Sequence, residues 1–345
     1  MYVAPRPRAE DDPLFPLRVG ALCAAMFAAI QVLDTQMPAL TLALPAAFVL
    51  GLRGAFNIGK IIGLGIAAPI LTLVLSWIFA VTREIPWLMI LTTFVLLLGG
   101  IHLARQRGNN LGFIIAIITV LLSVMSLQNR AFLHVIRDEL ITDSIAAAII
   151  VTLLYLVLPP KTKIIHDDRP QTATQSLFAG SVLRAGVATA YCFWLYLVLP
   201  PQDLIIALTA LFPLVFPGRS AMINEAKDRL HGTVIGLALV MPALVIFATV
   251  PSFAVMAIVV ALVGVGFGWG VMHGRMPPMV YQFATTTMLA TTVTAMASDI
   301  AMQALISRFA LTLTGAAGAV LAVMLIEETF PRFFKREPTL EPTPA

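Results

Sequence analysis

The sequence is poor in charged residues and in cysteines. Lysine, arginine, aspartate and glutamate make up 12% of its 345 residues, whereas a soluble domain usually carries about twice that fraction. Only two cysteines occur, Cys23 and Cys192, and both lie inside apolar runs. Neither a disulfide framework nor a thiolate metal site is therefore expected. The scarcity of charge argues against an ordinary soluble domain.

Catalytic and nucleotide-binding motifs are also missing. The sequence has no HExxH, paired CxxC, GxSxG or His-x-Glu signature, so nothing favours an enzyme, a cofactor or a metal site. The segment GAFNIGK (Gly54–Lys60) has the spacing of a phosphate-binding loop, but Ile61 follows it where Ser or Thr would hold magnesium. We therefore expect neither a nucleotide nor a nucleic acid as a partner.

Long hydrophobic runs fill most of the chain. Runs of roughly 15 to 21 apolar residues recur between short polar breaks, and about 20 residues span the hydrocarbon core of a bilayer. This pattern predicts an all-α, polytopic membrane protein, in contact with the lipid bilayer, with about twelve transmembrane helices. The predicted spans are 17–33, 37–52, 60–80, 85–104, 110–127, 140–158, 180–199, 203–217, 231–249, 251–272, 279–297 and 306–326.

Basic residues are distributed unevenly between the alternating loops. With these spans, 18 lysines and arginines fall on the side of the N-terminus, and only Arg83, Arg130, Arg137 and Arg308 fall on the other. Cytoplasmic loops of membrane proteins carry the excess of lysine and arginine. Both termini are therefore expected in the cytoplasm.

The two halves of the sequence repeat each other. LRVG (Leu17–Gly20) recurs as LRAG (Leu183–Gly186), and IGLGIAAP (Ile62–Pro69) recurs as IGLALVMP (Ile235–Pro242). Farther along, Arg137 corresponds to Arg308. Six spans per half, an even number, predict parallel repeats related by an axis along the membrane normal.

The repeat defines the expected organisation of the chain. It predicts a cytoplasmic tail over 1–16, a first six-helix repeat over 17–158, a cytoplasmic linker over 159–179, a second six-helix repeat over 180–326 and a cytoplasmic tail over 327–345.

The second span of each repeat is short and contains proline. Pro45 lies in span 37–52, and Pro213 and Pro217 lie in span 203–217. Short, proline-interrupted spans at corresponding positions of two repeats mark a substrate site near the midplane of a transporter. Broken helices free backbone groups that can face an anion.

Few ionisable residues lie in or beside the spans. Arg137, Asp143 and Arg308 are candidates for handling substrate or protons, because such groups are costly within a bilayer. Arg137 and Asp143 could equally form a structural ion pair or an anchor. Arg18 and Arg184 begin corresponding spans, where they either fix topology or attract an anionic substrate.

The most densely charged interior stretch is GRSAMINEAKDRLHGT (218–233). It falls between two predicted spans on the basic side. We expect it to be a cytoplasmic loop whose basic side chains fix orientation and whose Gly-Thr end lets the following helix pack closely.

The second copy contains three characteristic segments: LRAG, DLIIALTALFPLVFPGRS (203–220) and AKDRLHGTVIGLAL (226–239), the last with a Gly-Thr-x-x-Gly helix start at Gly232, Thr233 and Gly236. With these segments the copy resembles the fusaric acid resistance family of bacterial aromatic-acid exporters. RDELITDSIAAAIIVTLLYLVLPP (137–160) is similar to the sixth helix of the family. The first copy has Gly63 at the position of Gly236, but Gly59–Lys60 where Gly232–Thr233 stands in the second.

The resemblance implies an inner-membrane exporter of small aromatic or other weak organic acids, driven by the proton gradient. It further implies a short member of the family without the large cytoplasmic domain, working with a periplasmic membrane-fusion protein. A passive organic-anion channel and a non-transporting scaffold for envelope assembly remain as alternatives.

The predicted orientation is open to a direct test. In a background without Cys23 and Cys192, a membrane-impermeant maleimide added to spheroplasts should label Glu84→Cys, because that loop is expected in the periplasm. Thr172→Cys, in the predicted cytoplasmic linker, should be labelled only after lysis. The opposite labelling pattern would overturn the positive-inside assignment.

Overall fold

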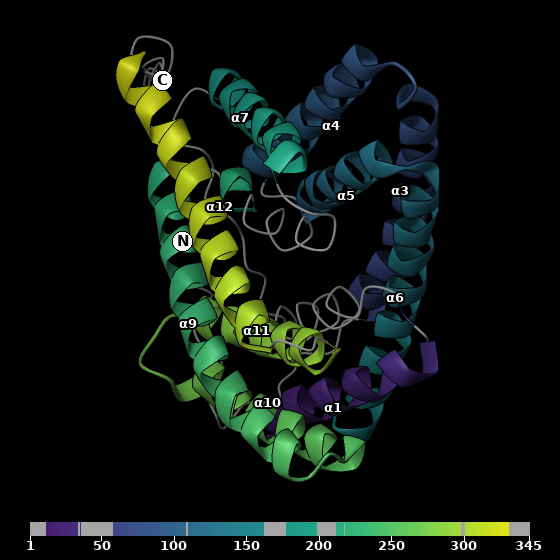
Figure 1. The fold of residues 1–345 in the computed structure, drawn as a ribbon, viewed down its shortest axis with the longest axis vertical. Helices are drawn as coiled ribbons and strands as arrows, with labels where there is room; N and C mark the ends of the chain where they lie inside the picture. The colour runs from purple at the N-terminus through teal and green to yellow at the C-terminus, as the bar shows by residue number, and fades with distance from the viewer. Residues whose placement is uncertain are drawn as a thin grey trace, which may run out of the picture.

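The computed structural model describes residues 12–33, 35, 58–107, 110–161, 177–198, 212–216, 218–297 and 301–330. Within these ranges the chain forms ten α-helices and one short 3-10 helix, and no strand (Figure 1). The elements are α1 (Phe15–Leu33), α3 (Ile58–Thr82), α4 (Pro86–Arg107), α5 (Asn110–Gln128), α6 (Arg130–Val157), α7 (Leu177–Val198), η1 (Phe212–Val215), α9 (Arg219–Thr249), α10 (Phe253–His273), α11 (Pro278–Ala297) and α12 (Ala301–Thr329). The predicted all-α class is confirmed.

Ten of the predicted spans coincide with the ten α-helices. Span 37–52, with Pro45, lies outside the described residues. Of span 203–217 only 212–216 is described, and there Pro213 is buried in η1, while Pro217 lies outside the description. The total of twelve spans therefore stays a prediction.

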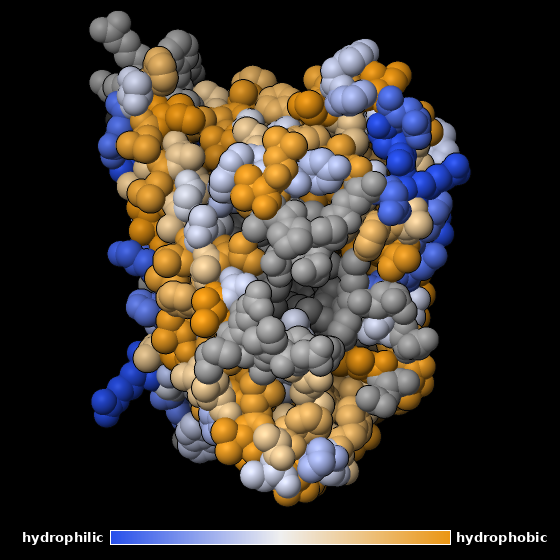
Figure 2. Space-filling view, viewed as in Figure 1, coloured by the Kyte–Doolittle hydropathy of each residue, from blue (hydrophilic) through white to orange (hydrophobic). Residues whose placement is uncertain are grey.

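The surface of the described helices is suited to lipid. Seven helices are long and apolar enough to cross a bilayer, and α1 and α5 contain shorter apolar segments. Large side chains such as Trp77, Leu153 and Leu262 are more than half exposed. Apolar residues cover most of the face in Figure 2, and hydrophilic ones gather at its upper right and left margins. Soluble proteins rarely expose apolar surface on this scale, so the chain is a multi-pass membrane protein.

Two helices begin ten or more residues before the predicted spans. α6 begins at Arg130 rather than at 140, because Asn129 caps it: the side-chain oxygen of Asn129 accepts a hydrogen bond from the backbone N–H of Phe132 at 2.8 Å. α9 begins at Arg219 rather than at 231 and runs for 31 residues. Charged residues near a helix start therefore belong to these helices and not to the preceding loops.

The prediction of a loop over 218–233 is wrong, because this stretch is the first part of α9. Met222 and Glu225, three residues apart, lie on one helix face and are buried, whereas Lys227 is exposed. The charges thus line an amphipathic extension of the helix. Gly232 and Thr233 consequently lie well inside α9 and not at its start.

The helices pair in the same way in the two halves, and the first helix of each half packs against the other half. α3 packs against α6 and α9 against α12, while α4 packs against α5 and α10 against α11. α1 lies against α10, and α7 lies against α4. Figure 1 shows α4, α5 and α7 at one end of the long axis and α1, α10 and α11 at the other.

The last helices of the two halves end at opposite ends of the long axis. α6 ends beside α1, and α12 ends beside α7 (Figure 1). A parallel repeat would bring both of these helix ends to the same membrane face. The positions of these two helix ends do not support the parallel relation, which stays a prediction that superposition of residues 17–158 on 183–326 tests.

The contact between α1 and α10 depends on glycine. A Cβ at Gly20 would lie 2.5 Å from Val265 Cγ2 and 2.6 Å from the carbonyl oxygen of Ala261. A Cβ at Gly264 would lie 2.9 Å from Gly20 Cα. The two backbones approach closely only because both positions lack a side chain.

The repeated Leu-Arg-x-Gly segment offers a matched test of this contact. Gly20→Ala should destabilise the protein by about 1–3 kcal/mol through overpacking. Gly186→Ala, at the corresponding position with no atom within 4 Å of the added carbon, should be neutral or gain up to about 1 kcal/mol of helix propensity. The melting midpoint of the detergent-solubilised protein measures both. Equal midpoints for the two variants would contradict the close approach of α1 and α10.

Candidate functional site

Arg18 links α1 to the end of α6 through a full set of close contacts. Its side chain is fully buried, and its two terminal nitrogens donate to both carboxylate oxygens of Asp12 at 3.0 and 3.1 Å. Its Nε donates to the carbonyl oxygen of Leu158 at 2.9 Å, and its Cζ lies 4.3 Å from the ring centroid of Tyr155. A bidentate carboxylate and a π-face neutralise this guanidinium well. Arg18 is therefore a structural tie.

Arg184 occupies the corresponding position of α7 but is held much more loosely. It is fully buried, and its Nη2 lies 3.8 Å from Glu327 Oε1 at the end of α12. Nη1 makes a long hydrogen bond of 3.5 Å to the carbonyl oxygen of Gly180 on its own helix. Among the described residues, neither Nε nor Nη2 of Arg184 donates a hydrogen bond, and neither oxygen of Glu327 accepts one.

A second buried arginine lies beside this pair. Nη1 of Arg105, on α4, donates to the carbonyl oxygen of Leu177 at 2.9 Å and to Ser181 Oγ at 3.0 Å, both on α7. A Cβ at Gly180 would lie 2.7 Å from that nitrogen, so the glycine makes room for the guanidinium. Arg105, Arg184 and Glu327 form what we call the Arg184 cluster. It holds two cations and one anion.

The chemistry available to the Arg184 cluster is anion binding. A buried charge without hydrogen bonds is costly, so such groups normally find partners. Arg184 retains donors in the planar geometry that matches a carboxylate. Its three named side chains are two guanidinium groups and one carboxylate, which is a composition that attracts an anion. Arg18, whose donors are already engaged, has no such capacity.

The structure does not assemble Arg137, Asp143 and Arg308. Arg137 is partly exposed and pairs with the adjacent Asp138 at 2.8 Å. Asp143 is fully buried on α6. The backbone of Arg308 lies in α12, and its side chain is outside the description. Because α6 and α12 run along opposite sides of the molecule (Figure 1), a joint role for these three residues stays a prediction.

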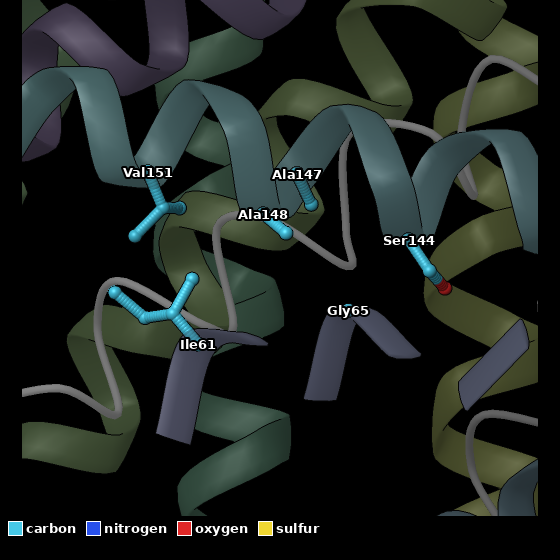
Figure 3. A pocket seen from close by; sticks show the side chains of 6 residues that line it. All are labelled: Ile61, Gly65, Ser144, Ala147, Ala148 and Val151. Atoms are coloured by element: carbon cyan, nitrogen blue, oxygen red, sulfur yellow. The ribbon is translucent and has the colours of Figure 1, made fainter. Parts of the chain in front are cut away.

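A small apolar hollow lies next to Asp143 in sequence. It is formed between α3 and α6 and is lined by Ile61, Gly65, Ser144, Ala147, Ala148 and Val151 (Figure 3). Among the described lining residues Ser144 is the polar one, and its hydroxyl donates to the carbonyl oxygen of Leu140 at 2.6 Å. The hollow therefore offers no free polar group to a ligand.

The glycines of the Gly-Thr-x-x-Gly segment hold α9 against α11. A Cβ at Gly232 would lie 2.6 Å from Phe283 Cβ, and one at Gly236 would lie 2.7 Å from the carbonyl oxygen of Ala284. Thr233 is buried between them. Gly63 lies in α3, and its surroundings are outside the description.

Sequence reasoning missed several buried charges. Arg105 and Arg229 were attributed to topology, and Glu327 lies one residue beyond the predicted end of its span. Arg229 pairs with Glu225 at 3.3 Å and packs over the rings of Phe212 and Phe283, with its Cζ 5.3 and 4.2 Å from their centroids. The spacing of four residues between Glu225 and Arg229 was the one available signal. Charged residues whose partners lie on different helices, such as Arg184 and Glu327, show no characteristic spacing in the sequence.

No metal-ligand set accompanies these charges. Over the described ranges, no group of three or more His, Cys, Asp or Glu side chains could hold a metal ion.

Comparison with known proteins identifies one family. Residues 187–322, from α7 into α12, match the family described as fusaric acid resistance protein-like. This match confirms the resemblance seen in the second copy and, with the apolar helices, indicates a membrane transporter. No curated protein matches the chain. No solved structure matches it either.

The different surroundings of Arg18 and Arg184 predict different costs of removal. Arg18→Ala should destabilise the protein by about 3–5 kcal/mol, because it leaves Asp12 buried without its cation. Arg184→Ala should cost less, since Glu327 still has Arg105 nearby. Unfolding midpoints in detergent compare the two variants. A larger loss for Arg184→Ala would show that the Arg184 cluster is the structural one.

Proposed function

We propose that this chain, whose residues 187–322 are fusaric acid resistance protein-like, exports small aromatic or other weak organic acids across the bacterial inner membrane. The observation that carries the proposal is the Arg184 cluster, with two guanidinium groups against one carboxylate. The carboxylate of the transported acid binds to Arg184 and is steadied by the positive charge of Arg105.

The apolar surroundings favour this use of arginine. The Arg184 cluster adjoins the core cluster that includes Ala185, Ala188 and Val323. In such a medium of low dielectric constant, attraction between a guanidinium and a carboxylate is much stronger than in water. A guanidinium is also less strongly hydrated than an ammonium and donates two parallel hydrogen bonds. Arginine therefore suits a site that must strip water from an organic acid.

The proposed export uses the proton gradient and involves no covalent change of the acid, no nucleotide and no enzyme activity. A periplasmic membrane-fusion protein is the proposed partner, because an acid released at the inner membrane must still leave the periplasm. The excess of basic residues on one side supports cytoplasmic termini.

Substitution of Arg184 tests the site. With purified protein in energised inside-out vesicles, Arg184→Gln should lower the rate of benzoate uptake roughly 10- to 100-fold, as expected for loss of a charged hydrogen bond. Arg184→Lys keeps the charge but not the paired donors, so its rate should be intermediate. Arg219→Gln is the control, because Arg219 forms a surface ion pair with Glu328.

Wild-type rates for Arg184→Gln at wild-type membrane levels would exclude the Arg184 cluster as the site. A protonophore distinguishes the transport modes: it should abolish uphill uptake by an exporter but leave downhill flux through a passive organic-anion channel. Absence of flux for any acid, with normal acid tolerance in a deletion strain, would favour the scaffold.

A further inference from the structure

The helix α11 is buried on every side, yet it is rich in threonine. Seven consecutive residues, 287–293, are buried, and two turns of helix turn them toward all directions. A helix that is buried all round is normally hydrophobic all round. Six of the 20 residues of α11 are threonines, and α11 is not among the seven helices that are long and apolar enough to cross a bilayer. α11 therefore places hydroxyl groups inside the protein.

Three of these hydroxyls are satisfied within the helix itself. Thr285, Thr286 and Thr294 donate to carbonyl oxygens three or four residues earlier, at 2.8, 3.1 and 2.8 Å. Such a bond is common for threonine inside a helix, because it satisfies the hydroxyl without a partner from another element. These three residues need nothing further from their surroundings.

Thr291 and Thr292 differ from the other threonines of α11. Both side chains are fully buried, and among the described residues neither hydroxyl has a hydrogen-bond partner. Neither hydroxyl bonds to the carbonyl oxygen one turn earlier, as that of Thr285 does. A buried hydroxyl without a hydrogen bond is costly. Two such donors next to each other are suited to a ligand that accepts hydrogen bonds.

The first half shows the same feature in α5, which packs against α4 as α11 packs against α10. The residues of α5 from 118 to 126 are all buried. Ser123 and Ser126 donate to carbonyl oxygens three residues earlier, at 3.0 and 2.8 Å. Thr119 is fully buried, and within the described ranges its hydroxyl has no partner. Each half thus holds an unsatisfied threonine hydroxyl on a buried helix segment.

We infer that the hydroxyls of Thr291 and Thr292 bind the carboxylate of the transported acid at a second, uncharged contact on its route. This role rests on the proposed function, since it requires that the chain transports an acid. α12 packs against both α11 and α7, so these hydroxyls and the Arg184 cluster lie on helices that share a neighbour.

Hydroxyl donors suit a contact from which the acid must leave again. A hydrogen bond to a carboxylate is stronger than one between neutral groups, but it lacks the second charge of an ion pair with arginine. Passage through a membrane protein needs contacts that are favourable enough to admit an ion and weak enough to release it. Protein encloses both hydroxyls here, so the acid reaches them when one half of the molecule moves against the other, as alternating access requires.

Replacing threonine by valine removes the hydroxyl and nearly keeps the shape. Thr291→Val combined with Thr292→Val should lower benzoate uptake into energised inside-out vesicles roughly tenfold, because hydrogen bonds to a charged group are lost. The melting midpoint of this double variant in detergent should stay the same or rise, because two unsatisfied polar groups leave the interior. A pair of threonines with a structural role would show a lower midpoint instead.

The same helix provides the matched controls. Thr285→Val and Thr294→Val each remove a hydroxyl that is already bonded within α11, so both variants should keep the wild-type rate of uptake. Thr291→Ser combined with Thr292→Ser keeps both donors and should retain most of the rate. Together these variants separate the loss of an open donor from the loss of any hydroxyl on α11.

The outcomes distinguish this inference from the proposed function. If the wild-type protein takes up no weak organic acid, the proposed function is wrong. If Arg184→Gln lowers the rate but the double valine variant keeps it, the Arg184 cluster stands as the site and the two hydroxyls bind no acid. A lower melting midpoint or a failure to fold in the double valine variant would show that the hydroxyls have partners within the protein, and an equal loss of uptake in Thr285→Val would show no special role. Each of these results would overturn the inference.

Discussion

A buried guanidinium needs an opposite charge and hydrogen-bond acceptors close to it, and this requirement shapes both halves of the molecule. In each half the arginine of the first helix meets the end of the last helix: Arg18 meets the end of α6, and Arg184 meets the end of α12. The first of these contacts is saturated with hydrogen bonds and the second is not. The same sequence segment therefore holds a saturated arginine in one half and an arginine with open donors in the other.

The exchange of first helices joins the two halves into one body. α1 packs on α10 of the second half, and α7 packs on α4 of the first. Arg105 belongs to α4, yet its hydrogen bonds go to Leu177 and Ser181 of α7. The Arg184 cluster is therefore built across the boundary between the halves, where relative movement of the two would change its geometry. The geometry of the Arg184 cluster thus depends on how the halves are arranged and not only on the residues within either.

Hydropathy located ten helices correctly because a helix buried in lipid needs a long apolar run, and such a run can be recognised from consecutive residues alone. It placed the starts of α6 and α9 too late, because the charged residues of an amphipathic helix extension lower the mean hydropathy of the segment to a value typical of a loop.

The candidate site was harder to predict than the helices. Arg137 and Asp143 are six residues apart, which places them about 120° apart around a helix, so proximity in sequence did not put them on one face. Arg184 and Glu327 are far apart in sequence, and no periodicity links them. The sequence did single out Arg184 itself, because the Leu-Arg-x-Gly segment that contains it occurs in both halves.

The contact between α1 and α10 can form only late in the synthesis of the chain. About 220 residues separate the end of α1 at Leu33 from the start of α10 at Phe253. At the usual rate of synthesis, about 5–20 residues per second, roughly ten to forty-five seconds pass before the partner of α1 is translated. During that time the glycine-containing face of α1, with Gly20, must wait in the bilayer or against the insertion machinery. Assembly of the native contacts is therefore a late, post-insertion event, and the membrane has to shelter an incomplete first half until the second half is nearly finished.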